Sequence, residues 1–397
     1  MSALFPDAEL YKLAAARPEN ELLLLCAHRG SGAEAAVRIG ELARGNVDWE
    51  YLYGLATRHS LLPLLYRGLE GAEVDAAPPE FRERLRVKFR ENASRNMLLA
   101  GELVRIARLF GEAGVPLLAY KGPALAVQAY GGLALRRFVD LDVIVGRRDV
   151  ARAGEMLSSL GFGKPAGLAE SQEKFLLRWQ HNLAYTRDGG RMIVELHWEV
   201  SPAPFARVPV DEGVWARAPS VEIFGAAVKC LSAEDLLVAL SVHGTKHLWE
   251  RLAWVCDVAA LVNSHADLNW PLVVRLARDS RVERMLYLAL RLAWGLLGAK
   301  LPEEVREAAC DGALAGLASE VASGQFSGAV YEPAGLARNV MFNMRARARL
   351  GEKVGYLRFI FTPTEGDLTA VTLPDSISFL YYLLRPLRLV LKGDDGH

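Results

Sequence analysis

The sequence predicts an α+β protein, in which a small mixed β-sheet is flanked by N-terminal helices and a C-terminal helical bundle. Apolar residues recur at helical spacing over about residues 5–115 and again after about residue 230, whereas short β-type runs occupy about residues 116–200. We therefore expect three parts: an N-terminal helical region at 1–115, a sheet-containing core at 116–229 and a C-terminal helical domain at 230–397. The length of 397 residues allows two or three such units.

The composition is that of an ordinary globular protein, with 51 % hydrophobic and 24 % charged residues. Forty-seven basic residues balance 47 acidic ones, so no overall field attracts nucleic acid or an anionic membrane, and any phosphate-binding feature must be local. The four cysteines are widely spaced, which predicts buried reduced thiols rather than a disulfide framework or a zinc site. Neither a signal peptide nor a transmembrane segment is evident, and we expect a cytoplasmic protein.

The first helical region is expected to end in a long helix. The segment 78–114 begins with proline, which is favoured at the first helical positions, and ends at Gly114. His59, earlier in the region, has no partner at ligand spacing. We therefore expect His59 to pack against or cap a helix.

The sheet is predicted from the runs "VPLLAY", "LDVIV", "LAYTR" and "MIVELHWEV". Between the last two runs, Asp188, Gly189 and Gly190 tolerate positive φ and predict a β-hairpin. In "FVDLDVIV", alternation places Asp140 and Asp142 on one face of a strand. Two neighbouring carboxylates repel each other unless a cation or a shared proton relieves them, so this pair is a candidate cation site.

The run "MIVELHWEV" predicts a third acid for this site. Glu195, His197 and Glu199 share one face if the run is a strand. If that strand pairs beside the Asp140 strand, Glu195 completes a cluster of three carboxylates, a ligand set that suits Mg²⁺ or Mn²⁺. His197 is expected to be a core or supporting histidine rather than a catalyst.

Basic groups surround the acidic strand. Lys121 and Gly122 lie where a strand turns into a helix, and free N–H groups at a helix start with a nearby ammonium favour anions. Arg136 and Arg137 offer planar donors for phosphate oxygens. The alternatives are an exposed lysine at a turn, one solvated arginine, and a structural ion-pair cluster or solvated edge strand for the two aspartates.

Helical spacing returns in the C-terminal part. Ser232 with Asp235 predicts a capped helix start. Within "SVHGTKHLWERLAWVCDVA", spacings of four, three, four and three residues predict one stripe of a continuous helix, formed by His243, His247, Glu250, Trp254 and Asp257. The favoured interpretation is that the stripe lines an active-site cleft. An interdomain polar face is the main alternative, and a zinc site the other, although the glutamate of a His-Glu-x-x-His motif is missing.

The ordered set "YKGPALA", "RRFVDLDVIV", "AGEMLSSLGF" and "VELHWEV", followed by "HGTKHLWERLAWVCDVAALV", resembles the uncharacterised nucleotidyltransferase family of the DNA polymerase beta-like superfamily. The resemblance covers about residues 20–270 well. It implies that residues 116–229 form a nucleotidyltransferase core. It also implies that Asp140, Asp142 and Glu195 are catalytic and hold the metal ions that activate a nucleoside triphosphate.

One feature departs from the pattern of the superfamily. A Gly-Gly or Gly-Ser turn usually precedes the acidic strand, whereas this chain has Lys121, Gly122 and Pro123 and a longer gap before Asp140. We expect Lys121 with Arg136 or Arg137 to supply part of the missing triphosphate contact. His243 and His247 are further nucleotide-binding candidates.

These observations predict a Mg²⁺- or Mn²⁺-dependent enzyme that transfers a nucleoside monophosphate from a nucleoside triphosphate to an acceptor and releases pyrophosphate. Glu195 or Glu199 is the candidate base for the acceptor's proton. Neutral charge favours a small molecule, a natural product or a peptide as acceptor over nucleic acid. The alternatives are a non-catalytic nucleotide sensor or scaffold and a toxin-like enzyme that nucleotidylates tRNA.

Overall fold

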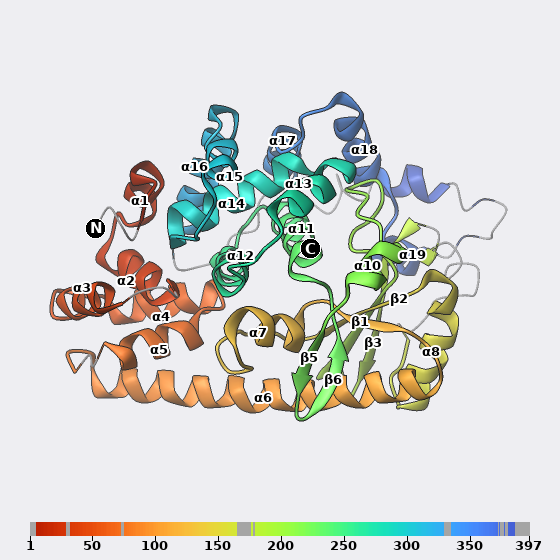
Figure 1. The fold of residues 1–397 in the computed structure, drawn as a ribbon, viewed down its shortest axis with the longest axis horizontal. Helices are drawn as coiled ribbons and strands as arrows, with labels where there is room; N and C mark the ends of the chain where they lie inside the picture. Colours follow the sequence, from red (N-terminus) through yellow and green to blue (C-terminus); the bar gives the residue numbers. More distant parts are fainter. Residues whose placement is uncertain are drawn as a thin grey trace.

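The structure is a computed structural model that describes residues 5–28, 32–72, 75–164, 176–177, 179–328, 335–371, 373, 377 and 380–385. Figure 1 shows a long helix, α6, along one edge of the molecule, with the N-terminal helices over its first half and the sheet over its second half. The C-terminal helices lie on the opposite side of the molecule from α6. The predicted order of helices, mixed sheet and helices is confirmed.

The N-terminal region is helical, as predicted. Its helices are α1 (Ala8–Ala14), α2 (Pro18–Ala27), α3 (Ala33–Ala43), α4 (Trp49–Arg58), α5 (Leu62–Gly71) and α6 (Pro79–Glu112). Helix α6 begins with proline and is followed by Gly114 at φ 67°, a conformation that glycine adopts without strain. Buried residues near the start of α6 pack in the cluster of the N-terminal helices, and those in its second half pack in the cluster of the sheet. Helix α6 therefore joins the two hydrophobic clusters of the described chain.

Four strands form the main sheet in the order β1-β2-β4-β3. The elements of this part are β1 (Leu117–Ala119), α7 (Gly122–Tyr130), β2 (Leu141–Val145), η1 (Arg147–Asp149), α8 (Val150–Ser159), β3 (Asn182–Arg187) and β4 (Met192–His197). Strands β2 and β4 are parallel, while β1 and β3 run antiparallel to their neighbours, so the sheet is mixed. The predicted hairpin joins β3 to β4, with positive φ at Asp188, Gly189 and Gly190.

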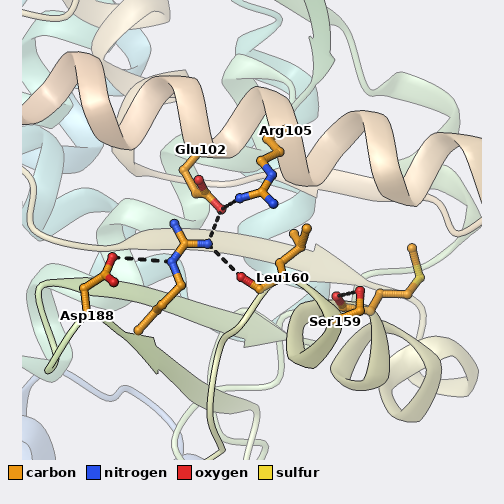
Figure 2. A network of polar contacts seen from close by, with 7 residues as sticks. Glu102, Arg105, Ser159, Leu160 and Asp188 are labelled. Atoms are coloured by element: carbon orange, nitrogen blue, oxygen red, sulfur yellow. Dashed lines mark hydrogen bonds and ion pairs between the residues drawn. The ribbon is translucent and has the colours of Figure 1, made fainter.

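The last residue of β3 fixes this side of the sheet against two helices. Arg187 donates through Nη1 to Glu102 Oε1 on α6 and to the carbonyl oxygen of Leu160, each at 2.9 Å. Figure 2 shows Glu102, Arg105, Leu160 and Asp188 around this guanidinium. Because Leu160 caps the end of α8, one side chain connects α6, α8 and the hairpin.

The remaining elements are α10 (Glu212–Arg217), β5 (Ser220–Ile223), β6 (Ala226–Lys229), α11 (Ala233–Lys246), α12 (Leu252–Ser264), α13 (Trp270–Asp279), α14 (Glu283–Leu297), α15 (Glu303–Ala309), α16 (Gly312–Gln325), α17 (Leu336–Arg345), α18 (Leu350–Phe361) and α19 (Glu365–Ala370). Strands β5 and β6 form a separate antiparallel hairpin. The predicted cap is present, because Ser232 Oγ accepts from the N–H of Asp235 at 3.2 Å. Within the described part of the chain, every helix is too short or too polar to span a bilayer.

The predicted continuous helix through His243 and Asp257 is wrong. Helix α11 ends at Lys246, and α12 begins at Leu252. Between them, Leu248 and Trp249 both adopt left-handed conformations at φ 54°. The Trp249 side chain, fully buried, folds back onto Gly244, where a Cβ would lie 2.4 Å from the indole ring. Burial of the indole outweighs the local preference for helix and reverses the chain.

His59 holds the start of α12, as its predicted capping role requires. Its Nδ1 accepts from the N–H of Leu252 at 3.0 Å, and its Nε2 lies 2.8 Å from the carbonyl oxygen of Gln325. The first contact requires an unprotonated Nδ1, so Nε2 carries the proton and donates. Burial lowers the pKa of His59 to about 3. A neutral histidine thus connects the N-terminal region with α12 and α16.

Candidate active site

The pairing of β2 with β4 brings the predicted acids together. In the parallel register, Asp142 lies directly opposite Glu195, and Ile144 lies opposite His197. Side chains opposite each other on adjacent strands project to the same face. The expectation that Glu195 lies beside the Asp-x-Asp strand therefore agrees with the register.

The turn after β1 adds a cation to this face. Lys121 Nζ lies 2.9 Å from Asp142 Oδ1. Gly122 begins α7 at φ 52°, and a Cβ there would lie 3.3 Å from the carbonyl oxygen of Asp140. Glycine therefore allows the start of the helix to approach the acidic strand closely. The backbone of Gly122 and the side chain of Lys121 therefore both lie next to the acidic strand.

His197 bridges two of the acids. Its Nε2 lies 3.1 Å from Asp142 Oδ1 and 3.2 Å from Glu195 Oε2. Asn182 Nδ2 donates to the same oxygen of Glu195 at 3.0 Å. His197 was predicted to be a supporting residue, whereas Asn182 was not predicted, because its contact depends on the antiparallel pairing of Asn182 with His197.

Burial and two nearby basic groups set the protonation of this cluster. Burial opposes ionisation of Asp142, but Lys121 and His197 outweigh it and hold the pKa of Asp142 well below its usual range. Burial also opposes the charge of Lys121, yet the carboxylates, chiefly Asp142, raise the pKa of Lys121 above its usual value. Burial lowers the pKa of His197, whereas the hydrogen bonds to Asp142 and Glu195 raise it. The net effect is an increase in the pKa of His197.

Asp140 lies at the edge of the cluster. Strand β2 begins at Leu141, so Asp140 precedes the strand rather than lying within it as predicted. Burial and the negative charge of Asp142 raise the pKa of Asp140 to about 6. An acid whose ionisation is resisted in this way gains from a nearby cation.

The two predicted arginines have different environments. Arg136 donates through Nε and Nη2 to the two oxygens of Asp257, at 2.9 and 3.0 Å. Tyr130 Oη donates to Asp257 Oδ1 at 2.9 Å. The guanidinium of Arg136 is thus occupied by a buried bidentate ion pair, while Arg137 is a partly exposed residue without such a partner in the described chain. Asp257, expected on the helical stripe, is the residue that orients Arg136.

Helix α11 supplies basic groups opposite the acids. The imidazole of His243 lies 4.8 Å from that of His247 and 5.4 Å from the Trp254 ring, measured between centroids. Burial and the charge of Lys121 lower the pKa of Lys246 to about 8, although Glu195 acts in the opposite direction. Among the described residues, the Lys246 ammonium has no ion pair or side-chain hydrogen bond. Lys246 was not predicted as a site residue, and its signal in the sequence is its position three residues after His243.

Glu199 is separated from this cluster. Strand β4 ends at His197, so the predicted alternation does not extend to Glu199. Its Oε1 lies 4.0 Å from Arg147 Nη1, and burial raises the pKa of Glu199. Glu199 therefore belongs to the region beyond the carboxyl ends of β2 and β4.

The donor set fits a divalent cation. In the described ranges, ligand atoms of Asp142, Glu195 and His197 lie within 4.8 Å of one another. Carboxylates suit Mg²⁺ and Mn²⁺, the imidazole also suits zinc, and a third carboxylate, that of Asp140, lies two positions before Asp142 in the sequence. Asp140 is outside this three-residue group, so the structure brings together two of the three predicted metal ligands and adds His197.

A nucleotide-handling class of protein is indicated by the mixed sheet, its adjacent acids and the facing basic groups. A sequence model of the family described as uncharacterised nucleotidyltransferase matches residues 45–298, which is more than half of the chain. The chain belongs to this family, as the resemblance predicted, and nucleotidyl transfer is its general activity.

Two solved structures have partial similarity to the chain. One is the solution structure of the antibiotic-resistance factor ANT(2'')-Ia, at 14 % identity over 45 % of this chain and 89 % of that chain, with a TM-score of 0.32. The other is an antigenic nucleotidyltransferase-like protein from Paracoccidioides brasiliensis, at 15 % identity over 53 % of this chain and 96 % of that chain, with a TM-score of 0.31. No curated protein matches the chain.

Proposed function

We propose that the protein is a divalent-metal-dependent enzyme that transfers a nucleoside monophosphate from a nucleoside triphosphate to an acceptor and releases pyrophosphate. The observation that carries this proposal is the register that places Asp142 opposite Glu195, with His197 bridging the two carboxylates. An acceptor hydroxyl oxygen bonds to the α-phosphorus, the bond from that phosphorus to the bridging oxygen breaks, and pyrophosphate leaves with the electron pair.

Asp142 and Glu195, with Asp140 beside them and His197 as a further donor, are the residues that would hold Mg²⁺ or Mn²⁺. A bound divalent ion supplies charge stabilisation for the phosphate oxygens. The residues of the chain fix the geometry: Asn182 orients Glu195 through its side-chain amide. This division of roles is usual for phosphoryl transfer, where positioning and charge stabilisation dominate catalysis.

The candidates for binding the triphosphate come from two helices. Lys121 and Gly122 lie at the start of α7, and His243, Lys246 and His247 lie at the end of α11. The Lys246 ammonium is the strongest of these candidates, because it is held among basic neighbours without a carboxylate partner in the described chain. Of the two glutamates considered as base, we place proton acceptance on Glu195, because Glu199 lies beyond β4 beside Arg147.

Measurement of pyrophosphate release tests the proposal. Each nucleoside triphosphate is incubated with Mg²⁺ and a panel of small hydroxylated molecules and peptides, and the Asp142→Asn variant is compared with wild type. We expect the variant to lose at least about a thousandfold in rate, about 4 kcal/mol of transition-state stabilisation. Asp188→Asn, in the exposed hairpin, changes the same functional group away from the site and should remain active.

Other outcomes distinguish the alternatives. Full activity of Asp142→Asn would contradict the metal assignment. Tight binding of a triphosphate without pyrophosphate release across the panel would favour the sensor or scaffold. Growth arrest on expression that disappears in Asp140→Ala would instead favour a tRNA-modifying toxin.

A further inference from the structure

A small polar pocket lies near the proposed site, at the start of α12. It has a volume of about 50 Å³, and its lining includes Ser60, Arg137, Arg251 and Trp254. Pockets that enclose a whole drug-sized ligand have volumes of roughly 300–1,000 Å³. This pocket therefore has room for one small chemical group rather than for a nucleotide.

The charge of the lining is strongly positive. Three arginines and one acidic residue line the pocket, and the acid, Asp257, already pairs with Arg136. Arg137 and Arg251 have no ion pair or side-chain hydrogen bond with any residue that the structure describes, and the Arg251 guanidinium lies 5.8 Å from the centroid of the Trp254 ring. Two positive charges in the lining are therefore uncompensated by the residues that the structure describes.

The two guanidinium groups also repel each other. Partial burial and the charges of Arg251 and Arg95 lower the pKa of Arg137. Around them, the lining offers the Ser60 hydroxyl and the first turn of α12, which contains no acidic residue. An anion would relieve the repulsion and accept hydrogen bonds from both planar forks.

The pocket lies close to the acid cluster. Arg136 and Asp257 line the pocket, and Arg136 is close enough to lower the pKa of Asp140 as one of several influences. Trp254 lines the pocket and also contacts His243 and His247, with ring centroids 5.4 and 5.3 Å apart. Within the described chain, the lining includes neither Lys121 nor Lys246, the cations assigned to the triphosphate.

We infer that the Arg137–Arg251 pocket binds an anionic group of the acceptor, a phosphate or a carboxylate, so that the acceptor is an acidic small molecule or peptide. The identification of this anion as part of the acceptor rests on the proposed function. The anion site itself rests on the pocket and on two arginines that have no acidic partner in the described residues. It assigns Arg137 to the acceptor rather than to the nucleotide.

Titration calorimetry with inorganic phosphate, and separately with acetate, tests the inference on the full chain. Each anion is titrated with and without a saturating non-hydrolysable triphosphate and Mg²⁺. We expect at least one of the anions to bind equally well in both conditions. In Arg137→Gln/Arg251→Gln that binding should be at least about tenfold weaker, equivalent to about 1.4 kcal/mol, while the affinity for the triphosphate changes less than about twofold. Arg90→Gln, an exposed arginine on α6, controls for the loss of positive charge.

Three results would overturn the inference: no binding of either anion to wild type, competition between the bound anion and the triphosphate, or weaker triphosphate binding in the double variant. The last two would assign the pocket to the nucleotide. Failure of the proposed function would give a different result. Wild type would then bind no triphosphate or release no pyrophosphate, while anion binding to the pocket could still be measured by titration. Circular dichroism of each variant shows whether it is folded.

Discussion

Two buried ion pairs lie close together in this molecule and differ in how completely their charges are balanced. In the Arg136–Asp257 pair, two guanidinium N–H groups and the Tyr130 hydroxyl satisfy both carboxylate oxygens. In the Lys121–Asp142 pair, Asp142 Oδ1 is approached by both Lys121 and His197, and the same ring nitrogen of His197 approaches Glu195. The first pair is saturated, whereas the second belongs to a cluster in which acids outnumber cations.

This difference separates a structural pair from a binding site. A saturated buried pair offers nothing to a ligand, and removal of one partner leaves an uncompensated charge. In the other cluster, Lys121 and His197 face three carboxylates once Asp140 is included, so a bound cation improves the balance. The Nδ1 of His197 also lacks a hydrogen-bond partner among the described residues.

The largest effect is expected from breaking the saturated pair. Asp257→Asn leaves the Arg136 guanidinium buried without a countercharge and should lower the free energy of unfolding by about 3 to 5 kcal/mol. Chemical denaturation measures this loss. Asp142→Asn should cost clearly less, because Lys121 retains Glu195 and Asp140 as neighbours. Equal losses in the two variants would contradict the distinction between the pairs.

Burial of His59, whose two ring nitrogens both form hydrogen bonds, predicts that the stability of the protein depends on pH. The folded-state pKa of His59 is about 3, below the unfolded value, so the unfolded chain binds one more proton between about pH 3 and 6.5. Stability should therefore fall as pH decreases through this window, by about 1.4 kcal/mol per pH unit from this group, or about 2.7 kcal/mol from pH 6 to 4. Denaturation curves of wild type and His59→Gln at several pH values measure it. Parallel pH dependences would show that His59 titrates normally.

The unsaturated cluster depends on orientation of Glu195. Asn182→Ala removes the amide that holds Glu195 Oε2 and should reduce kcat by about ten- to a hundredfold, as loss of a residue that supports a metal ligand typically does. The KM for the triphosphate should change much less. Steady-state pyrophosphate release measures both constants. A positioning role also requires partial rescue by Asn182→Gln, whereas an unchanged kcat in Asn182→Ala would exclude it.

The smallest effect concerns binding of the cation itself. Mg²⁺ at ten times its Kd should raise the free energy of unfolding of wild type by about 1.4 kcal/mol, because the folded acids bind it and the unfolded chain does not. Thermal denaturation with Mg²⁺ and with NaCl of equal ionic strength measures the specific part. Asp142→Asn should lose this response and Asp257→Asn should keep it. A shift of equal size in all three proteins would indicate a non-specific salt effect.

The helices, the strands and part of the site followed from local patterns. The hairpin at Asp188 and Gly189 and the long helix after Pro79 were predicted because φ preferences and apolar spacing act over a few residues. The reversal after Lys246 was not predicted, since it depends on packing of the Trp249 indole against Gly244. The saturation of Arg136 by Asp257 was missed because the two residues are 121 positions apart in the chain, so that only folding brings them together.

By itself, the sequence determined which residue types this site contains, because the alternation in "FVDLDVIV" and "VELHWEV" gives each strand one apolar and one polar face. Only the tertiary structure decided which charges are balanced. The β2–β4 register set Asp142 beside Glu195, and the break between α11 and α12 left Arg251 beside Arg137. Charge compensation acts between side chains that approach within a few ångströms, and such approaches between distant segments are created by folding.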